Sequence, residues 1–104
     1  MKYTTNLYIS KAINDKQKKK IMKRVNKNKN IKNIFFLCRI SESKNSLEIL
    51  SSAELYKMIR RNCNLVIVGL AKGKEDSFEL VRIIYDDMYS KTSQIDLDTY
   101  FNIS

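Results

Sequence analysis

The 104-residue sequence contains no histidine, no proline and no tryptophan, and only two glycines and two cysteines. Without histidine, the chain cannot build a serine-type triad, an imidazole acid–base catalyst or a histidine-ligated metal site. The two cysteines form no Cys-x-x-Cys motif, which excludes a disulfide scaffold and a zinc site made of cysteine alone. These absences argue against an enzyme, and we expect neither a cofactor nor a metal.

Long apolar segments are also missing. No run of about 18 apolar residues is present, so we expect no membrane-spanning helix and no membrane partner. The first ten residues are polar and lack the apolar core of a secretory signal, which favours a cytoplasmic protein. The length and the absence of linkers or repeats predict a single domain over residues 1–104.

The charge of the chain is strongly positive and unevenly distributed. The formal net charge is +9, and residues 1–40 carry 12 Lys or Arg against one acid, Asp15. Residues 41–104 carry 8 basic and 10 acidic residues. Such asymmetry is typical of a protein with a polyanionic partner. Alternatively, Lys, Asn and Ile together make up 38 of 104 residues, a bias that AT-rich coding would produce without selection for charge.

Apolar periodicity predicts an alternation of strands and helices. The expected strands are 6–10, 34–40, 47–50 and 64–71, and the expected helices lie near 15–27, 52–61 and 75–89. A turn is expected over 41–45, and residues 95–103 fit either a strand or a short helix capped by Asp96. Asn14 with Gln17 and Ser51 with Glu54 have the spacing of capping boxes at the first two helices.

The order β-α-β-β-α-β-α predicts an α/β fold. Two arrangements fit: a ferredoxin-like fold, or a mixed-sheet sandwich with a C-terminal helix covering the sheet. Strands 34–40 and 64–71 are apolar on both faces, so the second face must be covered by the third helix or by a second copy of the chain. The predicted core residues are Ile34, Phe36, Leu65, Ile67, Phe78 and Val81.

Three functional hypotheses follow, in order of preference. The first is a non-enzymatic protein that acts through protein contacts, as a homo-oligomer. The second is sequence-independent nucleic-acid binding by one flank of the first helix, which helical spacing assigns to Lys16, Lys19, Lys20, Lys23 and Lys27. The third is binding of a small anion at the glycine-containing turn before the third helix, by Gly69, Lys72, Gly73 and Lys74.

The other chemically interesting residues have plainer interpretations. Asp86 with Asp87, and Asp96 with Asp98, are expected to be surface charges rather than catalytic pairs. Cys38 lies among apolar residues of a strand, where a buried small side chain is expected. Cys63 follows two arginines, but no base accompanies it, and we expect a structural thiol.

Overall fold

The elements of the fold follow the predicted order, and a computed structural model describes them over residues 1–40 and 45–103. The strands are β1 (Lys2–Ile9), β2 (Ile34–Ile40), β3 (Leu47–Leu50) and β4 (Leu65–Lys72). The helices are α1 (Asp15–Asn26), α2 (Ser52–Arg60), α3 (Lys74–Thr92) and α4 (Leu97–Tyr100). Of the predicted turn at 41–45, only Asn45 lies within the described residues.

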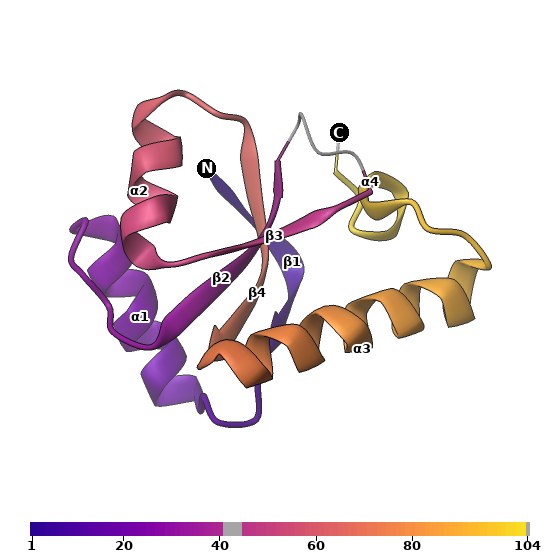
Figure 1. Cartoon of the computed structure of the whole chain (residues 1–104), viewed down its shortest axis with the longest axis horizontal. Coiled ribbons are helices and arrows are strands. Elements are labelled where there is room, and N and C mark those ends of the chain that lie inside the picture. Colours follow the sequence, from indigo (N-terminus) through magenta and orange to yellow (C-terminus); the bar gives the residue numbers. More distant parts are fainter. Residues whose placement is uncertain (41–44, 104) are drawn as a thin grey trace.

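The four strands form one mixed sheet in the order β1-β4-β2-β3. β1 runs parallel to β4, and β2 runs antiparallel to both β4 and β3. In Figure 1, α1 and α2 lie on one side of the sheet, and α3 and α4 lie on the other. The mixed-sheet alternative is therefore the one observed, with the third helix covering the second face. No helix in residues 1–40 or 45–103 is long and apolar enough to cross a membrane.

Each face of the sheet has its own apolar core. Phe36, Leu65 and Ile67 point toward α1 and α2 in the larger cluster, and Ile34 joins them. Leu37, Val68 and Ile84 belong to the smaller cluster under α3. The predictions of burial for Ile34, Phe36, Leu65 and Ile67 are confirmed, because alternate residues of β2 and β4 face opposite cores.

The prediction for Phe78 is wrong: its exposed fraction is 64%. Val81 is only half-buried. α3 instead turns Ser77, Leu80, Ile84 and Met88 toward the sheet. The side chain of Ser77 is small and its hydroxyl donates to the Gly73 carbonyl oxygen at 2.8 Å, so it can be buried without an unpaired polar group.

β4 contains a bulge, and α3 approaches the sheet closely at Gly69, next to it. Leu37 is paired with Gly69 and Cys38 with Ile67, so Val68 is an extra residue in β4. A Cβ atom at Gly69 would lie 3.3 Å from side-chain atoms of both Leu37 and Leu80. A larger residue would push the helix away from the strand, which explains glycine inside a buried strand.

Side chains cap the N-termini of α1 and α2, as predicted. The Asn14 side chain accepts from the Gln17 backbone N–H at 2.8 Å, and the Gln17 side chain accepts from that of Asn14 at 2.9 Å. Ser51 and Glu54 make the same reciprocal pair at 3.2 and 2.9 Å. Both capping boxes are confirmed.

Asparagine takes the place of glycine at the turns. Gly73 has a positive φ of 83°. Non-glycine residues occupy the left-handed region at six further described positions: Asn28, Asn33, Asn45, Asn62, Ser93 and Asn102. Asparagine tolerates this conformation better than other side chains, so a chain with two glycines can still end its helices and turn.

Candidate nucleic-acid interface

All five predicted contact lysines are exposed, four on α1 and Lys27 at its C-cap. Ile21 and Val25 of this helix are buried against the sheet. Lys16, Lys19, Lys20, Lys23 and Lys27 project to the other side, as a 100° rotation per residue requires. Lys18 does not belong to this flank: it is half-buried and lines a pocket together with residues of β1. The sequence therefore placed these side chains correctly, and whether they contact a nucleic acid stays a prediction.

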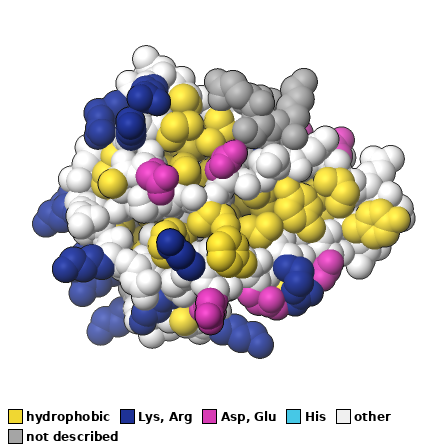
Figure 2. Space-filling view, viewed as in Figure 1, with side chains coloured by type: hydrophobic (Ala, Val, Ile, Leu, Met, Phe, Trp, Pro, Cys, Tyr) yellow, Lys and Arg dark blue, Asp and Glu magenta, His cyan; other side chains and the backbone are white. Residues whose placement is uncertain are grey.

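The fold adds basic residues that the linear pattern of α1 could not include. Lys29 and Lys32 lie in the loop to β2, and α2 with its C-terminal turn contributes Lys57, Arg60 and Arg61. Residues 15–33 and 52–62, which we call the basic layer, hold 12 Lys or Arg and only two acids, Asp15 and Glu54. Figure 2 shows that most dark-blue side chains on the visible face lie along the left and lower left, where Figure 1 places α1 and α2.

A small cationic pocket lies beside α1 and joins two of the predicted sites. It has a volume of about 220 Å³ and takes Lys20 and Arg24 from α1, Lys32 from the loop and Lys72 from the end of β4. Buried isoleucines, among them Ile21, form its floor. No acid is among the described residues that line it. Lys20 was predicted as a nucleic-acid contact and Lys72 as an anion contact, and here they share one concavity.

The turn predicted to bind an anion divides between the sheet and the helix. Gly69 lies inside β4 and is buried, whereas Lys72 ends that strand. Gly73 donates its N–H to the Asn33 carbonyl oxygen at 2.8 Å and precedes α3 without any side-chain cap. Lys74 is exposed beside Glu75 and Asp76 in the first turn of α3. These carboxylates repel an anion, so Lys74 is poorly placed to bind one. Lys72, in contrast, lies with Lys20 and other cations in the small pocket.

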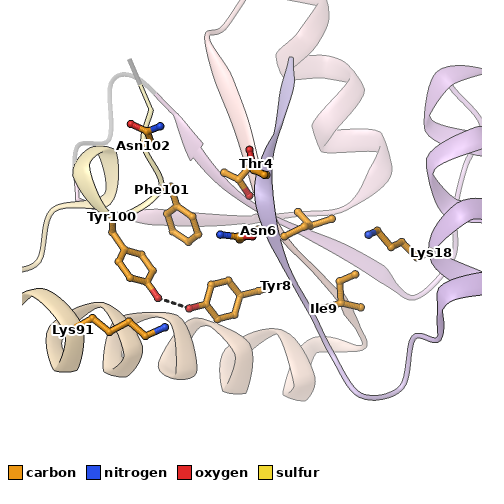
Figure 3. A pocket seen from close by; sticks show the side chains of 11 residues that line it. Thr4, Asn6, Tyr8, Ile9, Lys18, Lys91, Tyr100, Phe101 and Asn102 are labelled. Carbon is orange, nitrogen blue, oxygen red and sulfur yellow. Dashed lines mark hydrogen bonds between the residues drawn. The ribbon is translucent and has the colours of Figure 1, made fainter.

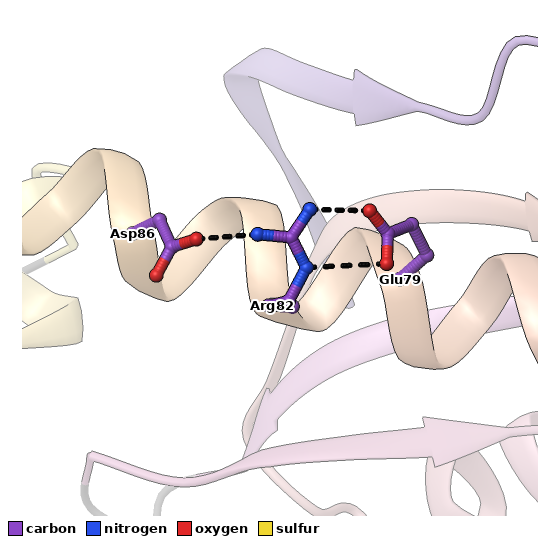
Figure 4. A network of polar contacts seen from close by, with 3 residues as sticks. All are labelled: Glu79, Arg82 and Asp86. Atoms are coloured by element: carbon purple, nitrogen blue, oxygen red, sulfur yellow. Dashed lines mark hydrogen bonds and ion pairs between the residues drawn. The ribbon is translucent and has the colours of Figure 1, made fainter.

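The opposite side of the molecule has the opposite charge. Residues 73–103, which we call the acidic layer, carry seven acids against Lys74, Arg82 and Lys91. Arg82 is held between Glu79 and Asp86 on the outer face of α3 (Figure 4). Its hydrogen bonds and its positive charge lower the pKa of the Glu79 carboxyl. Arg82 therefore offers little free positive charge to an anion.

Two of the acids predicted to be surface charges, Asp87 and Asp98, are partly exposed and also have polar partners. Asp87 accepts a hydrogen bond from the Tyr8 hydroxyl at 3.0 Å. Asp98 Oδ1 lies 2.9 Å from Nε of Arg39. The two groups form an ion pair, but their geometry is not that of a hydrogen bond. The Arg39 side chain is only 7% exposed, so Asp98 offsets a charge buried in the sheet and helps to hold α4.

The environment of Cys38 disfavours chemistry at its thiol. Cys38 is buried, and desolvation raises the pKa of its thiol, which disfavours the reactive thiolate. Cys63 is half-buried. Across 1–40 and 45–103, no three His, Cys, Asp or Glu residues come together as a metal site would require.

Comparison with known proteins does not add to this picture: no family model, no curated protein and no solved structure matches the chain.

Proposed function

We propose that the protein binds nucleic acid through the basic layer, by contacts to phosphates that do not depend on base sequence. The observation that carries this proposal is the separation of charge between the two helical layers. Net charge alone would follow from lysine-rich composition. Composition does not explain why 12 basic and two acidic residues share one layer while the other holds seven acids.

The geometry suits a polyanion better than a small ligand. The exposed lysines extend along the length of α1, and the cations of the small pocket continue them toward the end of β4. A chain of phosphates can contact several of these charges at once, and each contact releases counterions. Lysine makes such contacts as a point charge, which positions a backbone without reading bases.

The test is a fluorescence-anisotropy titration over a range of salt concentrations. The wild-type protein should bind labelled DNA or RNA, with an affinity that falls steeply between about 50 and 200 mM salt. The double variant Lys16→Gln/Lys23→Gln should bind more weakly on every sequence. Its log–log salt slope should be flatter by about 0.7–0.9 for each phosphate that the variant no longer neutralises.

The matched control removes the same charge from the acidic layer. Lys74→Gln/Arg82→Gln lowers the net charge by the same amount, and both residues are exposed. We expect its affinity and salt slope to stay close to wild type. Equally weakened binding in both variants would mean that overall charge, not the basic layer, attracts the polymer. No binding at about 50 mM salt, where electrostatic association is strong, would overturn the proposal.

Self-association is a second candidate, and one observation favours it. A flank of α3 leaves Phe78 and Tyr89 exposed by 64% and 60%, beside the half-buried Val81. Exposed aromatic side chains on a common flank are typical of contact surfaces. We expect a concentration-dependent dimer in light scattering that Phe78→Ser reduces. A protein that stays monomeric at all concentrations would contradict this second proposal.

A further inference from the structure

An open cleft of about 900 Å³ follows the outer edge of β1. Figure 3 shows its two walls: Lys18 points into it from α1, and Lys91, Tyr100 and Phe101 line the opposite side. β1 is the edge strand of the sheet, so its backbone forms the floor. The cleft begins at α1, the helix that carries the exposed lysines of the basic layer.

The floor of the cleft is irregular. Tyr3 is paired with Ile67 and Tyr8 with Gly69, so β1 holds three more residues than β4 between these pairs. The intervening segment bulges, and the side chain of Asn6 lies in the cleft (Figure 3). A bulged edge lacks the regular spacing of N–H and C=O groups that an added peptide strand would pair with. The cleft is therefore poorly suited to an extended peptide.

One wall is aromatic and held in place by hydrogen bonds. The Tyr8 hydroxyl donates to Asp87 Oδ2 at 3.0 Å and lies 2.6 Å from the hydroxyl of Tyr100. Since Tyr8 has one hydroxyl proton, Tyr100 must be the donor of the second bond. The ring of Phe101 stands edge-on to both tyrosines, at centroid distances of 5.9 and 5.0 Å. This wall is preorganised, so a planar ligand would meet it without further ordering.

Positive charge and amide groups complete the lining. Lys18 and Lys91 stand on opposite walls, and Lys91 Nζ lies 6.0 Å from the centroid of the Tyr100 ring. Asn6 and Asn102 add hydrogen-bond donors and acceptors. No acid is among the residues found to line the cleft. Cations, aromatic rings and amides together match a ligand that is planar, polar at its edge and negatively charged.

We infer that this cleft holds an unpaired nucleotide of the strand that the basic layer binds. The base lies against Tyr100 and Phe101, and its phosphate lies beside Lys91, whose Nζ is 6.0 Å from the centroid of the Tyr100 ring. The inference rests on the proposed function and goes beyond it, because it requires a single-stranded ligand. A duplex keeps its bases stacked and paired, so it could contact the lysines but could not fill the cleft.

The experiment compares three labelled ligands at equal salt: a single strand of about ten nucleotides, an abasic strand with the same number of phosphates, and a duplex. Wild-type protein should bind the base-bearing strand about five- to a hundredfold more tightly than the abasic strand, the gain expected from stacking one base. The duplex should bind no more tightly than the abasic strand when the two are compared for the same number of contacted phosphates.

Two tyrosine substitutions locate the effect. Tyr100→Leu removes a ring from the cleft and should abolish the preference for bases, while binding of the abasic strand stays close to wild type. Tyr89→Leu is the matched control, because Tyr89 is exposed on α3 and is not among the residues that line the cleft. Tyr100→Phe keeps the ring without the hydroxyl and should retain the preference. A preference that survives in Tyr100→Leu would overturn the inference.

A measurement on the unsubstituted protein makes the test independent of variant folding. The backbone amide resonances of Asn6 and Phe101 should shift with the base-bearing strand and stay unchanged with the abasic strand. Equal binding of both strands, or no shift at these amides, would reject the cleft and leave the proposed function standing. Binding of none of the three ligands would reject both proposals.

Discussion

The two helical layers bury the same sheet but differ in almost every other respect. The basic layer has 12 basic and two acidic residues, a larger apolar core, and two helices that begin with reciprocal capping boxes. The acidic layer has a smaller core, a long helix that follows Gly73 without a side-chain cap, and exposed aromatic residues. Stability and charge are thus distributed differently across the sheet, so their contributions can be separated by substitution.

The largest expected effect tests whether both cores contribute to one folding unit. Ile67 faces the core of the basic layer and Ile84 faces that of the acidic layer, and both are fully buried. Replacing either by Ala should lower the free energy of unfolding by about 2–5 kcal/mol, the usual cost of truncating a core isoleucine. Urea denaturation followed by circular dichroism measures this. A decrease under about 1 kcal/mol for Ile84→Ala would show that α3 packs loosely on the sheet.

The next largest effect concerns the residue that precedes α3. Gly73, before α3, has φ 83° and ψ 160°, a conformation that side chains other than glycine rarely adopt. Gly73→Ala should therefore lower the free energy of unfolding by about 1–3 kcal/mol through backbone strain. The neighbouring exposed Lys72 gives a control, because Lys72→Ala changes no restricted dihedral angle. Similar melting temperatures for both variants would contradict the assigned conformation.

At the helices of the basic layer, the caps should matter in a different way. Ser51→Ala should cost about 0.5–2 kcal/mol in unfolding free energy, because an N–H at the start of α2 loses its acceptor. Asn14→Ala should cost a similar amount at α1. Replacement of Ser51 by Gly should be milder, by the general ranking of residues at this position. Chemical denaturation of the four proteins gives the order, and a Ser51→Ala variant as stable as wild type would refute the cap.

What the sequence could predict also differs between the layers. The basic layer depends on local patterns: a cap three residues from its partner, and lysines at helical spacing around Ile21 and Val25. These need no knowledge of the sheet. In α3, two apolar series lie side by side, one through Phe78 and one through Leu80, and periodicity does not choose between them. The structure buries the series through Leu80, whose side chain approaches Gly69 so closely that a Cβ atom there would lie 3.3 Å from it.

The candidate sites follow the same division. Exposure of Lys20 was predictable, but its position beside Lys72 depends on how α1 lies over the end of β4. The cleft along β1 was not predictable from local patterns. It depends on an unequal register with β4 and on a hydrogen bond between Tyr8 and Tyr100, which are 92 positions apart in the sequence. Contacts of that separation leave no periodic signal, because they are set by topology.

The smallest expected effect is on stability, and its sign distinguishes the layers. Lys16→Gln/Lys23→Gln should change the free energy of unfolding by at most about 0.5 kcal/mol, because exposed side chains contribute little. The sign should be stabilising at low salt, since the variant relieves repulsion among the cations of the basic layer. Lys74→Gln/Arg82→Gln should be slightly destabilising, since Arg82 loses its pairing with Glu79 and Asp86. Both differences should shrink as the screening length falls below about 10 Å above 0.1 M salt. Thermal melts at low and high salt test this directly.

If both variants shifted in the same direction, the separation of charge would have no energetic consequence in the folded protein. Opposite signs, together with weaker nucleic-acid binding in the α1 variant alone, would mean that the clustered lysines are retained at a cost to stability and in favour of a polyanionic ligand.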